Sequence, residues 1–128
     1  MKRNASSIAA IAVFLLAILS CQLFSAKPSS TIKKFYRHVE AGELDDAMAL
    51  LSRSSAVATI GPAKVKAGLA EQTAAIKKKR GIASIDIQDE QINGETAVVK
   101  GSVKFNDGSS DSFEGGLIKE DGAWKIAK

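Results

Sequence analysis

The apolar residues that follow Gly81 recur at every second position, which is the spacing of a strand with one buried face. The clearest run places Ala97, Val99, Val103 and Phe105 on one face and alternates them with polar residues. Similar runs lie before and after it, at Ala83, Ile85 and Ile87, at Phe113 and Leu117, and at Trp124 and Ile126. The C-terminal half of the chain is therefore predicted to be a β-sheet with one apolar face.

Three glycine-containing pairs separate these runs, namely Asn93-Gly94, Asp107-Gly108 and Asp121-Gly122. Such pairs are typical of tight hairpins, because glycine adopts a positive φ without steric cost. Four strands joined by three hairpins form an antiparallel meander. Its apolar face needs a cover, and the residues before Gly81 are available to provide one.

The spacing of the residues before Gly81 is helical. Apolar side chains from Ile32 to Val39 fall at i, i+3, i+4 and i+7, which predicts an amphipathic helix. We expect this helix to follow an N-cap at Ser29 or Ser30 and to end at Gly42.

Two further helices follow in the sequence. The range 44–51 repeats the helical spacing, and the range 62–81 begins with a proline suited to a first helical turn and closes at Gly81. The range 52–59 (SRSSAVAT) is predicted to be a loop. The predicted fold class is α+β, with three N-terminal helices packed on a four-stranded antiparallel meander.

The N-terminal segment is typical of a secretory signal peptide. Lys2 and Arg3 precede Ile8–Leu19, an unbroken apolar run that is shorter than the ~20 residues of a comfortable membrane-spanning helix. Because the basic end stays cytoplasmic, the residues that follow are expected to be exported.

The tetrapeptide Ile18-Leu19-Ser20-Cys21 resembles the lipobox of bacterial lipoprotein signal peptides. The resemblance implies that Cys21 is lipidated and that signal peptidase II cuts between Ser20 and Cys21. It predicts a signal peptide over residues 1–20, a lipidated tether over 21–28 and one globular domain over 29–128. Two or three acyl chains hold a protein on a membrane, whereas a single chain binds only reversibly.

Two alternatives remain for this segment. Cys21 is an incidental cysteine if an ordinary signal peptidase cuts after Phe24-Ser25-Ala26, although a bulky phenylalanine stands there where a small residue belongs. The apolar run is an uncleaved anchor if Leu23 and Phe24 extend it. Under the lipoprotein interpretation the protein lies in the cell envelope. Gln22 after the cysteine then favours the periplasmic face of the outer membrane in a host that has one.

Composition excludes several classes of function. The net charge is +4, of which Lys2 and Arg3 supply two and no acid lies in Met1–Ser20, so the mature chain carries +2. This mild charge, with 5% aromatic residues, argues against nucleic-acid binding. One cysteine permits no internal disulfide, and no motif predicts a metal site or a cofactor.

Two stretches resemble a known superfamily. They are Ile32-Lys33-Lys34-Phe35-Tyr36 with the following range 40–47 (EAGELDDA), and the closing segments 105–109 (FNDGS) and 119–126 (KEDGAWKI). This pattern, over roughly 29–127, resembles the nuclear-transport-factor-2-like (NTF2-like) superfamily, also described as cystatin-like. Within it the chain is similar to bacterial lipoproteins of unknown function that once carried a provisional lumazine-binding label.

The resemblance implies a cone, in which a bent sheet wraps around the helices and encloses a pocket. Gly101 and Gly115-Gly116 fit this expectation, because glycine within a strand often marks a bulge or a bend. Possible pocket residues are Tyr36, Phe35 and Trp124.

Enzymes of the superfamily pair an aspartate with a histidine or tyrosine inside the cone, and this pair is not evident here. His38 lies off the apolar stripe, whereas Tyr36 lies on it. The inward positions from Ala97 to Phe105 hold no carboxylate. Alternation directs Asp86 and Glu114 outward, and Asp107 and Asp121 belong to turns. The chain is therefore predicted not to be an enzyme, unless a bulge changes the strand register.

The basic run Lys77–Arg80 is interpreted as the last turn of a helix, where cations suit the helix dipole, rather than as a lipid-headgroup site. We expect a membrane-tethered domain that binds a small ligand, a peptide or an envelope protein. The alternatives are an isomerase- or dehydratase-like enzyme and a purely structural domain with a filled cone. A homodimer through the sheet is a further possibility.

Overall fold

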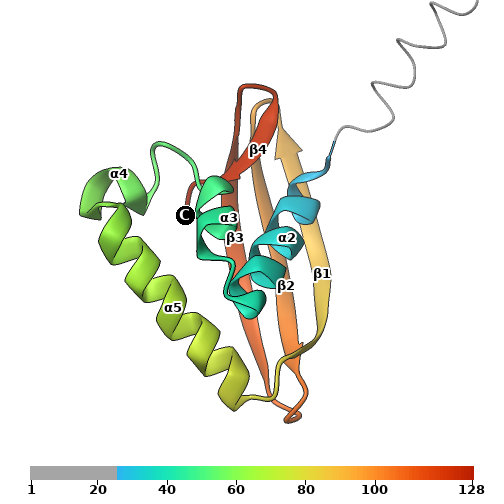
Figure 1. The fold of residues 1–128 in the computed structure, drawn as a ribbon. Coiled ribbons are helices and arrows are strands. Elements are labelled where there is room, and N and C mark those ends of the chain that lie inside the picture. The colour runs from blue at the N-terminus through green and yellow to red at the C-terminus, as the bar shows by residue number, and fades with distance from the viewer. Residues whose placement is uncertain (1–25) are drawn as a thin grey trace, which may run out of the picture.

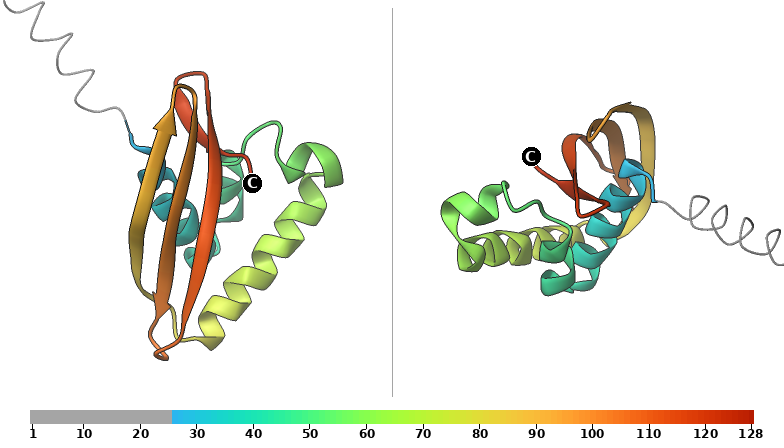
Figure 2. Two further views of the ribbon diagram at one scale, coloured as in Figure 1. Left: turned by 180° about the vertical axis from the view of Figure 1, so that it is seen from behind. Right: turned by 90° about the horizontal axis from the view of Figure 1, so that it is seen from above.

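The computed structural model describes residues 26–128, which form one layer of helices against one antiparallel sheet (Figure 1). The strands follow the order β1-β2-β3-β4. Figure 2 shows the helical layer on one side of this sheet. The elements are α2 (Pro28–Ala41), α3 (Leu44–Ala49), α4 (Ala56–Ile60), α5 (Pro62–Lys78), β1 (Ile82–Asn93), β2 (Thr96–Phe105), β3 (Ser110–Glu120) and β4 (Ala123–Ile126). The α+β prediction is confirmed.

The first described helix begins earlier than the sequence predicted. Its N-cap is Lys27, and Pro28 occupies the first helical turn, where a missing N–H costs nothing. Pro28 is buried, so the tether predicted over 21–28 overlaps the folded domain at its last residue. Gly42 ends α2 at φ 75°, as predicted. In the described part of the chain, no helix is long and apolar enough to cross a membrane.

The segment predicted as a loop contains a fourth helix. In α4 the Ser55 side chain caps the helix by accepting a hydrogen bond from the main-chain N–H of Val57 at 3.3 Å. A helix this short carries no full apolar period, so the sequence pattern could not show it. The third predicted helix is α5, which begins at Pro62 as expected.

The three predicted hairpins are all present. Gly94, Gly108 and Gly122 have positive φ values of 62°, 89° and 79°. Asp121 also has a positive φ of 51°, so the β3–β4 turn has the two left-handed residues of a type I′ hairpin. The alternating pattern of β2 is confirmed, because Ala97, Val99, Val103 and Phe105 are all buried.

The start of β1 departs from the predicted alternation. Ile82 is buried while Ala83 is exposed, because the pairing of β1 with β2 shifts between Ile82 and Ser84. A second shift lies between Ile87 and Asp89. The bulges expected at the strand glycines are therefore in β1, whereas the β2–β3 register runs without a break.

Gly101 and Gly115 instead permit close packing. A Cβ atom on Gly101 would collide with the main-chain oxygen of Asp86 and lie 2.8 Å from Cζ of Phe113. A Cβ atom on Gly115 would lie 2.9 Å from Cδ1 of Ile32, which belongs to α2. These glycines let the bulged strand β1 and the helix α2 approach the middle of the sheet.

Two apolar clusters form the core between helices and sheet. One lies around Val39, Val103 and Phe105, and the other contains Trp124 with Val99, Leu117 and further residues. The segment after α3 completes the second cluster, because Leu51 forms a parallel bridge with Ile126. The main-chain N–H of Ser52 donates to the oxygen of Ile126 at 2.8 Å. The outer edge of β4 is thus covered by the chain itself.

Candidate functional site

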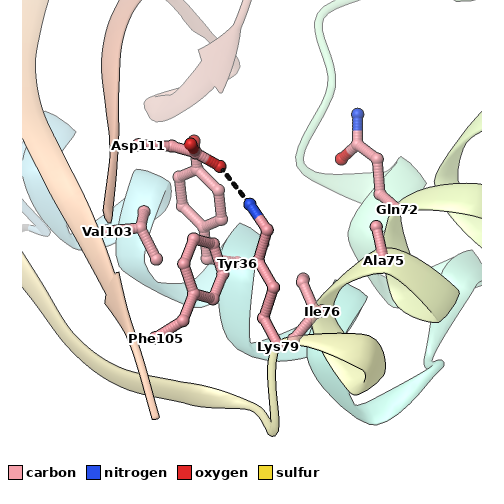
Figure 3. Close-up of a pocket in the computed structure, with 8 residues that line it drawn as sticks. All are labelled: Tyr36, Gln72, Ala75, Ile76, Lys79, Val103, Phe105 and Asp111. Atoms are coloured by element: carbon pink, nitrogen blue, oxygen red, sulfur yellow. Dashed lines mark hydrogen bonds and ion pairs between the residues drawn. The ribbon is translucent and has the colours of Figure 1, made fainter. Parts of the chain in front are cut away.

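A hollow of about 280 Å³ lies between α5 and the inner face of β2 and β3 (Figure 3). We call it the Tyr36 hollow. The phenol of Tyr36 reaches it from α2, and Lys79 and Asp111 reach it from the end of α5 and from β3. Its full lining is Tyr36, Gln72, Ala75, Ile76, Lys79, Val103, Phe105 and Asp111.

An ion pair crosses this hollow from the helical layer to the sheet. Nζ of Lys79 lies 2.9 Å from Oδ2 of Asp111, and it also lies 4.4 Å above the centre of the Phe105 ring. Both charges are partly solvated, so the pair contributes little to stability. The pair matters more for binding, because it places a hydrogen-bond donor and an acceptor side by side next to apolar side chains.

The Tyr36 side chain lies behind this ion pair. Burial raises the pKa of the Tyr36 phenol, and the negative charge of Asp111 raises it further. The phenol therefore stays protonated at neutral pH and is available as a hydrogen-bond donor. Its ring packs against Phe35 and Phe113, with centroid distances of 6.0 Å and 5.4 Å.

Asp111 is a carboxylate on the inner face of the sheet that the sequence analysis missed. It pairs across the sheet with Val103, which is buried, so both side chains belong to the inner face. The absence of a carboxylate was predicted only for the inward positions from Ala97 to Phe105, which belong to β2. Counting back two positions from Phe113 would have placed Asp111 on that face.

A second carboxylate reaches the inner face because of the bulge in β1. Glu90 pairs with the buried Val99 after the register shift at Ile87/Asp89. Its Oε2 atom accepts a hydrogen bond from the main-chain N–H of Ser29 at 2.8 Å. Glu90 thus accepts a hydrogen bond from an N–H that has no partner within α2, and its negative charge interacts favourably with the positive end of the helix dipole. These contacts give Glu90 a structural role.

The three predicted pocket residues lie in different places. Tyr36 lines the Tyr36 hollow, and Tyr36 with Phe35 also lines a second hollow of about 130 Å³ next to Gly115. Trp124 lines neither hollow. It is buried in the core cluster, and its main-chain oxygen accepts a hydrogen bond from the Thr31 hydroxyl at 3.4 Å.

Three side chains of metal-ligand type also meet outside the Tyr36 hollow. The ligand atoms of His38, Glu43 and Asp46 lie within 4.8 Å of one another. The left-handed turn at Gly42 brings Glu43 back toward His38, a proximity that helical spacing does not predict. Nδ1 of His38 lies 3.7 Å from Oε1 of Glu43, and all three side chains are accessible to solvent, which fits an ordinary polar contact on the surface.

The other residues singled out from the sequence are the basic run after Ile76 and the predicted lipidation site. Lys77 and Lys78 lie exposed in the last turn of α5, as the helix-dipole interpretation requires, while Lys79 turns inward. Ser20 and Cys21, the predicted cleavage and lipidation residues, lie outside the described residues.

Comparisons with known proteins agree with this fold. A family model described as a domain of unknown function, DUF4878, matches residues 21–127. A candidate NTF2-like transpeptidase from Campylobacter jejuni is similar over 79% of this chain and 97% of its own, with 25% identity and a TM-score of 0.70. No curated protein matches the chain significantly.

A second solved structure is more distant in sequence. A SEC-C motif containing protein from Rhodopseudomonas palustris is similar over 81% of this chain and 77% of its own, with 12% identity and a TM-score of 0.56. At that identity the likeness concerns the fold alone. The NTF2-like architecture that the sequence resemblance implied is confirmed.

Proposed function

Because the chain belongs to the DUF4878 family, a domain of unknown function, and has an NTF2-like fold, we propose that it is a membrane-tethered binding domain. Its ligand enters the Tyr36 hollow with an apolar group and an adjoining polar group. The observation that carries this proposal is the pairing of Lys79 and Asp111 at 2.9 Å beside the apolar wall of the hollow.

The chemistry of the hollow favours a ligand such as an amide. Lys79 donates and Asp111 accepts, so an uncharged group with an acceptor next to a donor can bind alongside the pair. Ile76, Val103 and Phe105 supply apolar surface for the rest of the ligand. The volume of about 280 Å³ is near the lower end of the ~300–1,000 Å³ typical of ligand pockets, which suits one side chain of a peptide or a small molecule.

The lining favours binding over catalysis. The Campylobacter jejuni relative is described as a candidate transpeptidase, but acyl transfer through a covalent intermediate uses a nucleophile such as serine, cysteine or threonine. None of the eight residues that line this hollow is of those types. The isomerase-like alternative needs a free base, and here Asp111 is paired with Lys79 while the Tyr36 phenol stays protonated.

The predicted lipid anchor suits the position of the hollow. The family match begins at Cys21, the predicted first residue of the mature protein. The chain enters α2 beside the β1–β2 hairpin, whereas Lys79 and Phe105 lie near the β2–β3 hairpin at the other end of the sheet (Figure 1). A tether at Cys21 would thus leave the hollow directed away from the membrane, toward ligands in the envelope.

To test the proposal, the mature protein is purified in mild detergent from its native envelope and examined for ligands that remain bound. Ala75→Phe would fill the hollow, and Ala74→Phe is the matched control because Ala74 is exposed on the same helix and does not line it. We expect mass spectrometry to find small molecules or peptides with the wild type and the control and not with Ala75→Phe. Equal recovery from all three proteins would contradict the proposal.

A further inference from the structure

One edge of the sheet remains unpaired beside the Tyr36 hollow. β4 pairs with residues 117–120 of β3, and the chain after β4 adds hydrogen bonds at Gly116 only. The N–H of Gly116 donates to the oxygen of Lys128 at 2.9 Å, and its oxygen accepts from Ala127 at 2.7 Å. Within the described residues, β3 from Ser110 to Gly115 has no strand on that side; we call it the free β3 edge.

The register shows which main-chain groups point outward there. Gly116 directs its N–H and oxygen to the β4 side, whereas Lys119 donates its N–H to Glu95 on the β2 side at 2.8 Å. Hydrogen-bonding direction alternates along an antiparallel strand, and the β2–β3 register has no break. The N–H and carbonyl groups of Ser112 and Glu114 therefore point to the free β3 edge.

The surroundings of this edge fit a peptide. Asp111 lines the Tyr36 hollow, and Phe113 and Gly115 line the second, 130 Å³ hollow, so the inner-face positions of the edge border two successive hollows. Ser112 and Glu114, which carry the free main-chain groups, are exposed. An extended peptide matches both features, because its backbone can pair with Ser112 and Glu114 while every second side chain turns toward a hollow.

We propose that the free β3 edge binds an extended peptide, which adds to the sheet as a strand in line with β4. This inference rests on the proposed function, since one peptide side chain occupies the Tyr36 hollow. The Lys79–Asp111 pair then meets the amide groups of the peptide near that end of the edge. A peptide is favoured over a compact small molecule because only a backbone can satisfy a row of strand donors and acceptors.

The experiment uses a displayed library of random seven-residue peptides and the mature protein, purified in detergent from its native envelope. The affinity of an enriched peptide is then measured for two variants of one position. Ser112→Pro removes the outward N–H and leaves the bonds to β2 intact, as proline is tolerated at strand edges. Ser112→Ala keeps the N–H. We expect affinity to fall about tenfold or more for proline and less than about twofold for alanine.

A second measurement needs no variant. In the wild type, the peptide should slow hydrogen exchange of the Ser112 and Glu114 amides at least about tenfold, while the Asp111 and Phe113 amides, already directed to β2, change little. Unchanged exchange at Ser112 and Glu114 would overturn the edge proposal even if Ser112→Pro does not fold.

The outcomes separate this inference from the proposed function. If the peptide loses affinity for Ala75→Phe but binds Ser112→Pro as well as Ser112→Ala, the hollow binds and the edge does not. If no peptide is enriched while small molecules co-purify with the wild type, the proposed function stands and the peptide class is wrong. If the library enriches nothing and no ligand co-purifies, both fail.

Discussion

The pKa of the Tyr36 phenol on α2 is raised by its burial and is raised further by the negative charge of Asp111 on β3. Tyr36 is the only tyrosine of the chain, so tyrosinate absorbance reports this one group. Asp111→Asn should lower the pKa of Tyr36 relative to the wild type, yet leave it above the ordinary value of about 10, because burial is the larger cause. Asp107→Asn, on the neighbouring exposed turn, is the control and should change little. An unchanged titration curve for Asp111→Asn would contradict the geometry of the hollow.

The raised pKa of Tyr36 also predicts how stability depends on pH. The folded-state value lies above the unfolded value, so the contribution of Tyr36 is fully present below about pH 10 and is lost as the pH rises through the folded pKa. The stability of Tyr36→Phe should therefore fall less steeply than that of the wild type in this alkaline range. Urea unfolding of both proteins at neutral pH and above pH 10 measures the difference. Parallel curves would show that the phenol ionises as easily in the folded protein as in the unfolded one.

Trp124 is predicted to be a structural residue and not a ligand contact. It is 8% exposed within the second core cluster. Trp124→Ala should cost about 3–5 kcal/mol, a large part of the roughly 5–15 kcal/mol by which a domain is stable. Tyr36→Phe should cost about 1 kcal/mol or less at neutral pH. Chemical denaturation of the domain Lys27–Lys128 and of its two variants measures these differences in stability. A Trp124→Ala domain as stable as the parent would be incompatible with the packing described.

The close approach at Gly101 gives a matched pair of glycine variants. Gly101→Ala would place a methyl group against the Asp86 oxygen and the Phe113 ring, and should destabilise the domain by about 1–3 kcal/mol. Gly116→Ala lies on the other face of the sheet, 3.2 Å from Cγ of Lys128, a flexible chain that can move aside. Thermal unfolding should show a clear decrease in stability for Gly101→Ala and little change for Gly116→Ala. A larger decrease for Gly116→Ala would contradict the close packing described at Gly101.

The lipid anchor is testable at Cys21. Cys21→Ala removes the thiol that the lipobox resemblance assigns to lipidation, so the variant should accumulate as an unprocessed precursor. Metabolic labelling with a radioactive fatty acid, followed by electrophoresis, compares it with the wild type. Equal incorporation of label by both proteins would show that Cys21 is not the acylated residue.

The sequence predicted the sheet well where the strand pattern was long and uninterrupted. The alternation from Ala97 to Phe105 and the three glycine turns were sufficient to predict the strand and its buried face. Each inward residue of β2 is indeed more than nine-tenths buried or has no side chain. The pattern failed at Ala83, where a bulge exchanges the faces of β1. A single sequence contains no reliable signal for such a bulge, since its cause is the fit between two strands.

The site was predicted only in part. Tyr36 was identified from the helical stripe, but its partners were not: Asp111 belongs to a strand whose pattern is broken by two glycines, and Lys79 was grouped with the exposed lysines beside it. Lys79 turns inward because it lies at the end of α5 opposite β3. That relation is set by the packing of the two layers, which helical spacing alone does not give.

The parallel bridge between Leu51 and Ile126 has a consequence for the order of folding. It joins the segment after α3 to the last strand, and the bond from Thr31 to Trp124 spans 93 positions of the chain. The second core cluster therefore forms only after β4 has been synthesised, because it contains residues from both the first described helix and the last strand. Removal of the last few residues should therefore prevent the second core cluster from forming, even though most of the chain would still be present.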